Sequence, residues 1–212
     1  MIEPTIEQTA QLDRFSKELY AANTVMNLTR IPREEFGLKH VLDSLLLSEF
    51  VREGADMLDI GTGAGFPAWP LACCRPDIQV TAIDSFTKAI MFLETVPLPN
   101  LRAVKVRAED CGWVEKFDVV TGRALAPLPI QLEISAASCR VGGLVIPMRT
   151  PAEEEAIHRF PAELLGLELG AVEMRPLPGT DIVRCFPVFL KIAKTPNKYP
   201  RTWAEIRRQP LA

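Results

Sequence analysis

Short apolar runs alternate with amphipathic stretches of helical length along the chain from Asp56 onward. This alternation is typical of strand–helix units that repeat around a parallel sheet. The runs that we expect to form strands are Met57–Ile60, Val80–Asp84, Leu101–Val106, Phe117–Thr121 and Leu144–Pro147. The stretches that we expect to form helices are Pro67–Cys74, Thr87–Thr95, Pro129–Ser138 and Glu153–Leu164. The sequence therefore predicts an α/β fold built on a mostly parallel sheet.

The two ends of the chain depart from this alternation. Before it, Thr5 and Gln8 stand at capping-box spacing at the start of one amphipathic helix, and a second helical stretch follows Pro32. After it, the runs Leu167–Arg175 and Ile182–Ile192 are separated only by a short turn-forming segment rich in proline. We expect these two runs to form an antiparallel hairpin that closes the sheet.

The length of 212 residues is that of one domain with a sizeable apolar core. We expect residues 1–54 to form a helical extension packed on the core, residues 55–195 to form the α/β core, and residues 196–212 to form a basic tail. No apolar run approaches the roughly 18 residues that span a bilayer, and the start Met1-Ile2-Glu3-Pro4 lacks the basic flank of a signal peptide. We therefore expect a cytoplasmic protein without a membrane segment, and a monomer.

The chain has five cysteines without a C-x-x-C pair, and two histidines. We expect reduced core cysteines and no metal centre, because neither a disulfide framework nor paired Cys and His ligands can be recognised. The formal net charge of −3 disfavours a uniformly basic nucleic-acid binder but leaves local basic patches open.

The first expected strand runs directly into three glycines, Gly61, Gly63 and Gly65, and a helix begins near Phe66 and Pro67. Glycines permit positive φ angles and close approach of a ligand to the backbone, while a helix N-terminus offers free N–H groups. We interpret this loop as the binding site of a nucleotide-like cofactor. The alternative is a tight turn without a ligand.

Asp84 stands at the end of the second expected strand, nineteen residues after Gly65. A carboxylate there can accept hydrogen bonds from both hydroxyls of a ribose, so the loop and Asp84 together suit adenosine. The spacing alone fits NAD as well as S-adenosylmethionine. The methyl donor is favoured by Phe66 in place of the third glycine of the dinucleotide motif, by the two preceding helices and by the closing hairpin.

Nearly the whole chain resembles one family through the order and spacing of several segments. These are Asn27–Thr29, His40–Ser44, Leu58–Pro67, Asp84-Ser85 with Lys88, Arg107–Asp110, Gly122–Ala124, Tyr199–Arg201 and Pro210-Leu211. They are similar to the RsmG (GidB) family of bacterial methyltransferases, which modify ring nitrogen seven of guanine in 16S ribosomal RNA. The resemblance implies a Rossmann-like class I methyltransferase fold, S-adenosylmethionine as cofactor, and 16S ribosomal RNA or the small ribosomal subunit as partner.

The resemblance also implies roles for individual residues. A cofactor pocket would be lined by Gly61, Phe66, Asp84, Ala108, Glu109 and Arg123, and Asn27, His40 and Arg123 would face the opening for RNA. The chain departs from the family pattern at Ala68, at Ala89 and at Arg149-Thr150, where Arg149 keeps a positive charge without the shape of lysine.

Nitrogen seven of guanine carries an in-plane lone pair, so its methylation needs no general base. We therefore expect no residue that reacts, and we name Arg123 and His40 as residues that position the reactants. A guanidinium, from Arg123 or Arg149, can donate to the guanine oxygen beside the target nitrogen. The segment Thr121–Ala124 lacks the motif of amine methyltransferases, and no Pro-Cys dipeptide supplies a nucleophile for methylation at carbon.

Several alternatives stay open at this point. His40 can be a hydrogen-bonded residue at the edge of the core, and Asn27 can simply cap or turn the chain before Pro32. Arg123 is expected to serve positioning and not folding, the alternative being a surface arginine. The whole chain can also be a methyltransferase of the same fold that acts on a small molecule or a protein, or a nucleotide-binding module without catalysis.

Cations gather near the C-terminal end of the chain. Between positions 191 and 208 the sequence has Lys191, Lys194, Lys198, Arg201, Arg207 and Arg208 against one acidic residue, Glu205. Tyr199 and Trp203 lie among them, and aromatic faces can stack on bases beside cations that neutralise phosphates. We expect Arg201, Arg207 and Arg208 to bind RNA and to leave the cofactor site unaffected; the alternative is a solvated tail.

Overall fold

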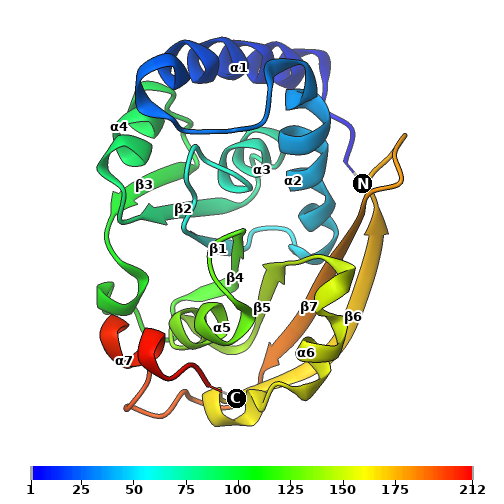
Figure 1. Cartoon of the computed structure of the whole chain (residues 1–212). Helices are drawn as coiled ribbons and strands as arrows, with labels where there is room; N and C mark the ends of the chain where they lie inside the picture. The colour runs from blue at the N-terminus through cyan, green and yellow to red at the C-terminus, as the bar shows by residue number, and fades with distance from the viewer. Residues whose placement is uncertain (1, 212) are drawn as a thin grey trace.

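Seven strands form one mixed sheet in the order β3-β2-β1-β4-β5-β7-β6 in the computed structural model, which describes residues 2–211 (Figure 1). The strands are β1 (Asp56–Ile60), β2 (Gln79–Asp84), β3 (Leu101–Lys105), β4 (Phe117–Arg123), β5 (Cys139–Met148), β6 (Leu167–Pro176) and β7 (Val183–Lys191). Strands β1 to β5 run parallel, β7 is antiparallel to β5, and β6 is antiparallel to β7. The predicted parallel sheet with a closing antiparallel hairpin is confirmed.

Neighbouring residues of each strand enter two separate cores, one on each face of the sheet. In β1, Met57 belongs to one apolar cluster and Leu58 to the other, as the alternation of strand side chains requires. The first face is covered by α1 (Ile6–Met26), residues 33–50, α3 (Ala68–Cys74) and α4 (Thr87–Thr95). The second is covered by α5 (Leu128–Ala136), α6 (Glu154–Arg159) and α7 (Trp203–Arg208) (Figure 1).

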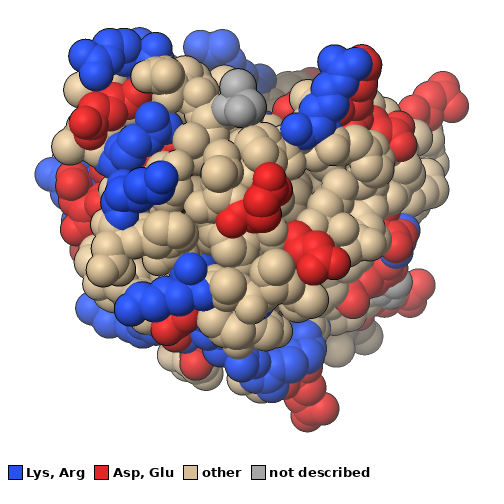
Figure 2. Space-filling view, turned by 90° about the horizontal axis from the view of Figure 1, so that it is seen from below, with Lys and Arg blue, Asp and Glu red and all other residues tan. Residues whose placement is uncertain are grey.

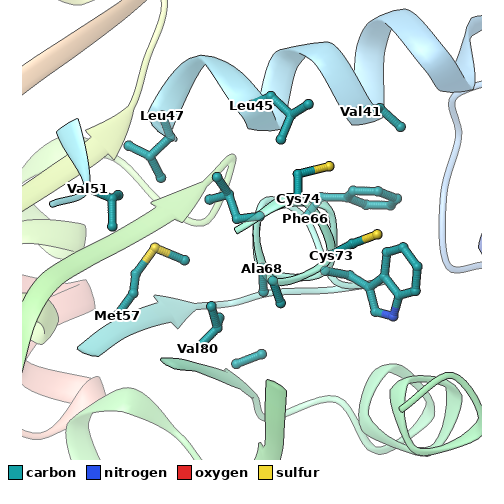
Figure 3. Close-up of a cluster of buried hydrophobic side chains, with 14 of the residues drawn as sticks. Val41, Leu45, Leu47, Val51, Met57, Phe66, Ala68, Cys73, Cys74 and Val80 are labelled. Carbon is teal, nitrogen blue, oxygen red and sulfur yellow. The ribbon is translucent and has the colours of Figure 1, made fainter. Parts of the chain in front are cut away.

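The second helical stretch predicted from the sequence is present but irregular. It consists of η1 (Arg33–Glu35), the π-helical segment η2 (Phe36–Leu42), α2 (Asp43–Leu45) and η3 (Leu46–Phe50). The π-helical segment buries Phe36, His40 and Val41. Further along, Leu45 and Leu47 extend the apolar face that Figure 3 shows above Phe66.

The helix predicted over Glu153–Leu164 is wrong in its length. The structure has α6 and then a separate 3₁₀ segment, η6 (Ala162–Leu165). Pro161 causes the break, because a proline disfavours the helical conformation of the preceding residue, and Phe160 is extended with φ −66° and ψ 127°.

Strand β5 begins at Cys139, earlier than the predicted start at Leu144. Its first residues pair with Phe117 of β4 across an irregularity in register. Gly142 and Gly143 interrupt the apolar run there, so the sequence pattern does not predict this part of the strand. A bulge lets the strand continue through the two glycines.

The basic tail expected at residues 196–212 contains a helix, α7, that was not predicted. The Thr202 N–H donates to the Glu205 carboxylate at 3.1 Å, and Ile206 is fully buried in the second core. The N-terminal extension and the tail thus both fill cores of the sheet, which supports our proposal that the chain forms one structural domain. Among the helices of residues 2–211, none has both the length and the apolar character of a bilayer-crossing segment.

Two glycines with similar backbone angles test how tightly the segment between β7 and the tail is packed. Gly166 has φ +72° and a Cβ added there would lie 2.3 Å from the Ala193 carbonyl oxygen, whereas Gly179 has φ +75° and open space around it. Alanine costs about 1 kcal/mol in left-handed strain at either position, and a clash adds about 1–3 kcal/mol. We expect urea denaturation to show a larger loss of unfolding free energy for Gly166→Ala than for Gly179→Ala. Equal losses would mean that the segment at Ala193 moves aside freely.

Candidate functional site

The glycine loop between β1 and α3 is held against β2. Gly61 and Thr62 donate their backbone N–H groups to the Ile83 carbonyl oxygen at 2.8 and 3.0 Å. The three loop glycines have positive φ angles: Gly61 69°, Gly63 54° and Gly65 99°. A Cβ at Gly61 would lie 2.3 Å from Leu125 Cδ1, whereas a Cβ at Gly63 would meet nothing within 4 Å. Packing therefore requires glycine at position 61, and the loop leaves open space at Gly63.

A cavity of about 310 Å³, which we call the cofactor cavity, lies beside this loop at the carboxyl ends of β1, β2 and β4. Its lining comprises Ile60, Gly61, Ile83, Asp84, Ser85, Val106, Arg107, Ala108, Glu109, Ala124, Leu125, Ile134 and Trp203. Ligands of open α/β sheets bind at this edge, where the strand order reverses. The cavity brings together four of the predicted cofactor residues: Gly61, Asp84, Ala108 and Glu109.

Asp84 is held in place by two backbone donors. Its Oδ2 accepts from the Gly63 N–H at 2.9 Å, and its Oδ1 accepts from the Phe86 N–H at 2.8 Å. Each carboxylate oxygen has two lone pairs, so both retain capacity for a ligand hydroxyl. The glycine loop and its acidic partner are thus one hydrogen-bonded unit.

The far wall of the cofactor cavity is built around Ala108, Glu109 and Trp203. Arg107 Nε donates to Glu109 Oε1 at 2.5 Å, and the Arg107 guanidinium lies 4.8 Å from the centre of the Trp203 ring. The tail therefore reaches the cofactor cavity through Trp203, whereas the independence of this site from Arg201, Arg207 and Arg208 stays a prediction. Sequence reasoning missed Trp203, although the capping box formed by Thr202 and Glu205 was a signal for its helix.

Phe66 and Arg123 lie outside the lining of the cofactor cavity, although the resemblance places them in it. Phe66 is buried in the first core, and its ring stacks on His40 with centroids 3.8 Å apart and planes 11° apart. Apolar burial against α1 draws this side chain away from the loop edge. Gly63 and Gly65 are also outside the lining. Gly63 donates its N–H to Asp84, which does line the cavity.

A second cavity of about 420 Å³ adjoins the first, and Ala124 lines both. We call it the substrate cavity. Its lining comprises Ile31, Lys39, Asp43, Arg123, Ala124, Met148, Arg149, Thr150, Glu153 and Arg184. It lies over the ends of β4, β5 and β7, next to the cofactor cavity along the same edge of the sheet.

Arg123 connects the end of β4 to the N-terminal extension. Its Nη1 donates to the Lys39 carbonyl oxygen at 3.0 Å and to Asp43 Oδ2 at 2.8 Å, and its Nη2 lies 3.1 Å from His40 Nδ1. The other oxygen of Asp43 accepts from Arg184 Nε at 2.5 Å. The Asp43 side chain is only 1% exposed, so loss of Arg123 would leave a buried carboxylate with one partner. These contacts lead us to expect that Arg123 contributes to folding as well as to positioning.

His40 is a neutral imidazole with a defined tautomer. A guanidinium can only donate, so Nδ1 accepts from Arg123, and Nε2 carries the proton toward Thr29 Oγ1 at 2.9 Å. Burial, and then the charge of Arg123, lowers the pKa of His40 to about 3. Asn23, which sequence reasoning missed, positions Thr29 by accepting its N–H at 2.9 Å.

Arg149 forms a buried part of the wall of the substrate cavity. Its Nη1 donates to the Ala126 carbonyl oxygen at 2.8 Å and lies 3.3 Å from Glu153 Oε2, while its Nη2 donates to Gln131. Burial lowers the pKa of this guanidinium. Gln131 in turn donates to the Gly122 carbonyl oxygen at 2.9 Å, which ties the arginine to β4.

The remaining predicted RNA contacts lie apart from both cavities. Asn27 is exposed and ends α1 with φ +55°, so it takes the capping role that was the alternative. Arg201 forms a two-point ion pair with buried Glu133, with Nε–Oε1 2.9 Å and Nη2–Oε2 2.6 Å. It therefore anchors the tail on α5, and its contact with RNA stays a prediction. Arg207 and Arg208 are exposed on α7.

The cofactor cavity fits S-adenosylmethionine. Asp84 offers acceptors for the ribose hydroxyls, and Ala108 offers a small apolar surface for the adenine. Under the loop, burial raises the pKa of Asp59 to about 7, and its Oδ1 has no hydrogen-bond partner among the described residues.

The strand order, the glycine loop and the acidic residue at the end of β2 define a class I S-adenosylmethionine-dependent methyltransferase. Within this class, the chain belongs to the GidB family, rRNA small subunit methyltransferase G, whose model matches residues 8–175.

Full-length relatives support the same family, and a solved structure supports the fold. The chain is 38% identical over 225 residues to ribosomal RNA small subunit methyltransferase G of Lactobacillus delbrueckii subsp. bulgaricus, covering 99% of this chain and 93% of that protein. The Pelotomaculum thermopropionicum protein of the same name is 36% identical over 220 residues, with coverages of 98% and 92%. A complex of the Haloferax volcanii Trm112 methyltransferase activator with a putative methyltransferase is similar with TM-score 0.62, 14% identity and coverages of 83% and 97%. This last likeness shows the fold alone.

The neutral state of His40 makes the stability of the protein depend on pH. In the folded protein the pKa of His40 is about 3, below the ordinary histidine value of 6.5. The contribution of His40 to the free energy of unfolding is therefore fully present above pH 6.5 and is lost as the pH falls toward 3. It changes by about 1.4 kcal/mol per pH unit in that window. We expect denaturation curves to show a smaller loss of unfolding free energy between pH 7 and pH 5 in His40→Gln than in the wild type. His158→Gln, at an exposed histidine, should show the wild-type loss. Parallel pH dependence in the wild type and His40→Gln would contradict a buried neutral His40.

Proposed function

We propose that this chain transfers the methyl group of S-adenosylmethionine to ring nitrogen seven of a guanine in small-subunit (16S) ribosomal RNA. The observation that carries the proposal is the adjacency of two cavities that share Ala124. A base in the substrate cavity lies next to the place where the methyl donor binds. Membership in the rRNA small subunit methyltransferase G family supports the choice of RNA.

The side chains of the substrate cavity suit a reaction without proton transfer. S-adenosylmethionine supplies an electrophilic methyl group when it is bound, and the guanine nitrogen already presents a lone pair. His40 cannot act as a base, because Arg123 occupies its only free lone pair. The protein therefore acts by orientation, which supplies roughly 7–11 kcal/mol in favourable cases.

Within this proposal, the chain holds the cofactor by three groups. Asp84 would accept hydrogen bonds from the ribose hydroxyls, the glycine loop at Gly61 would lie along the ligand, and Ala108 and Trp203 would contact the adenine. The cation of Arg107 over the Trp203 ring fixes that ring in place. These residues bind and orient, and none of them needs to change its protonation state.

We place the RNA along the carboxyl edge of the sheet, from the substrate cavity to α7. Lys39 and Arg184 lie at the rim of the cavity, and Arg207 and Arg208 are exposed on α7. On the face shown in Figure 2, Lys and Arg gather in separate groups with acidic side chains between them. Binding would therefore use local phosphate contacts. Both cavities are lined by one chain, so a monomer acting on 16S ribosomal RNA or the small subunit suffices.

The reaction can be tested with small subunits isolated from cells that lack this protein. We expect labelled S-adenosylmethionine to yield 7-methylguanosine in 16S RNA by nucleoside mass spectrometry. Asp84→Ala removes two hydrogen bonds to a charged group, each worth about 1.5–3 kcal/mol, so calorimetry should show at least roughly tenfold weaker cofactor binding. Glu94→Ala, at an exposed carboxylate of α4, is the matched control.

Other outcomes of this experiment distinguish the other functions. Label in a small molecule or a protein, with no label in RNA, would favour a same-fold enzyme with another substrate. Failure to bind S-adenosylmethionine would favour a nucleotide-binding module without catalysis.

The contribution of α7 can be tested separately through salt dependence. Each phosphate contact adds about one unit to the slope of log affinity against log salt. The double change Arg207→Ala with Arg208→Ala should lower RNA affinity and reduce this slope by up to about two units. Arg14→Ala with Lys17→Ala on α1, at the opposite end of the molecule in Figure 1, is the control. An unchanged slope would restrict the RNA surface to the rim of the substrate cavity.

A further inference from the structure

The arginines around the substrate cavity are already engaged by acceptors of the protein. Arg123 and Arg184 converge on Asp43 from two strands, at 2.8 and 2.5 Å. Arg149 donates both terminal nitrogens to the wall behind it. An incoming base therefore finds few free donors here, although three guanidinium groups line the cavity.

The two carboxylates of the cavity differ in the acceptor capacity that they retain. Asp43 is 1% exposed and each of its oxygens faces an arginine. The Glu153 side chain is 35% exposed, and its contacts are long: 3.3 Å to Arg149 Nη1 and 3.5 Å to Thr150 Oγ1. Hydrogen bonds between a cation and a carboxylate normally measure about 2.7–2.9 Å, so Glu153 keeps lone pairs for a ligand.

Glu153 lies on the side of the substrate cavity away from the cofactor. It follows β5, whereas the cofactor cavity lies over the carboxyl ends of β1, β2 and β4. Glu153 lines the substrate cavity and not the cofactor cavity. A guanine that turns nitrogen seven toward the methyl donor presents its opposite side, with N1–H and the N2 amino group, toward β5.

Arg149 lies beside this acceptor but offers no accessible donor of its own. Its Nε is buried, its Nη1 contacts Glu153, and its Nη2 donates to Gln131. The guanine edge carries the donors N1–H and N2–H next to each other. The free acceptor capacity of the Glu153 carboxylate complements these two donors.

We propose that Glu153 accepts hydrogen bonds from N1–H and the N2 amino group of the target guanine, which selects guanine and stabilises the charge that the base gains. This inference rests on the proposed function. Adenine carries a lone pair at N1 in place of the proton, so the same carboxylate repels it.

The charge on Glu153 favours the methyl transfer itself. A bond forms between nitrogen seven and the methyl carbon while the bond from that carbon to the sulfonium sulfur breaks. The positive charge passes from sulfur to the purine ring, and no proton leaves. A carboxylate at N1 therefore interacts more strongly with the transition state than with the neutral base, which is the condition for lowering the barrier.

The test compares Glu153→Gln with Glu154→Gln, which makes the same change of charge one position along at an exposed residue. We expect Glu153→Gln to methylate small subunits roughly ten- to a hundredfold more slowly at saturating substrate, the effect of losing a hydrogen bond to a charged group. Glu154→Gln should stay within about twofold of the wild type. Calorimetric cofactor affinity and the melting temperature should be the same in all three proteins, which shows that the site is intact.

Subunits reconstituted with inosine at the methylated position give a second readout. Inosine lacks the N2 amino group, so the wild type should lose at least about fivefold in rate on inosine, whereas Glu153→Gln should lose much less because its carboxylate is already absent. A wild-type rate in Glu153→Gln, or an undiminished inosine penalty in that variant, would overturn the proposal. If the wild type itself leaves guanine unmethylated, the proposed function fails, and that measurement is independent of the variant.

Discussion

The buried carboxylate of Asp43 joins three parts of the chain that are far apart in the sequence. Asp43 belongs to the N-terminal extension, Arg123 to the end of β4, and Arg184 to β7. A carboxylate out of water is tolerated because both of its oxygens have charged partners. The substrate cavity exists because this contact brings the extension and the ends of two strands together.

The same network connects the substrate cavity to the glycine loop. Arg123 holds His40 as a neutral acceptor, and His40 stacks on Phe66, the residue after the last glycine of the loop. The Arg123 guanidinium also lies 5.3 Å from the centre of the Phe66 ring. The family resemblance implied that Phe66 contacts the cofactor and that His40 faces the opening for RNA. In the fold they form one packed unit that supports both cavities from behind.

The tail shows how an ion pair can redirect a basic segment. Arg201 binds Glu133 of α5 at two points and through its backbone N–H, and this bond turns the chain so that Trp203 enters the cofactor cavity. A segment that its composition marks as an RNA contact is therefore partly a wall of the cofactor site. Its remaining exposed cations, Arg207 and Arg208, stay available for phosphates.

The sequence by itself determined the features that depend on neighbours along the chain. Strand–helix alternation indicated a mostly parallel sheet, the proline-rich turn indicated the hairpin, and the glycine loop with Asp84 located the cofactor cavity, because backbone freedom and apolar periodicity are local properties. Only the tertiary structure decided which charges meet. Asp43 and Arg123 are 80 positions apart, and Arg201 and Glu133 are 68 apart. The sequence shows that these residues are charged, but long-range packing selects their partners, and so decides that Arg201 anchors the tail while Glu153 keeps free oxygens in the substrate cavity.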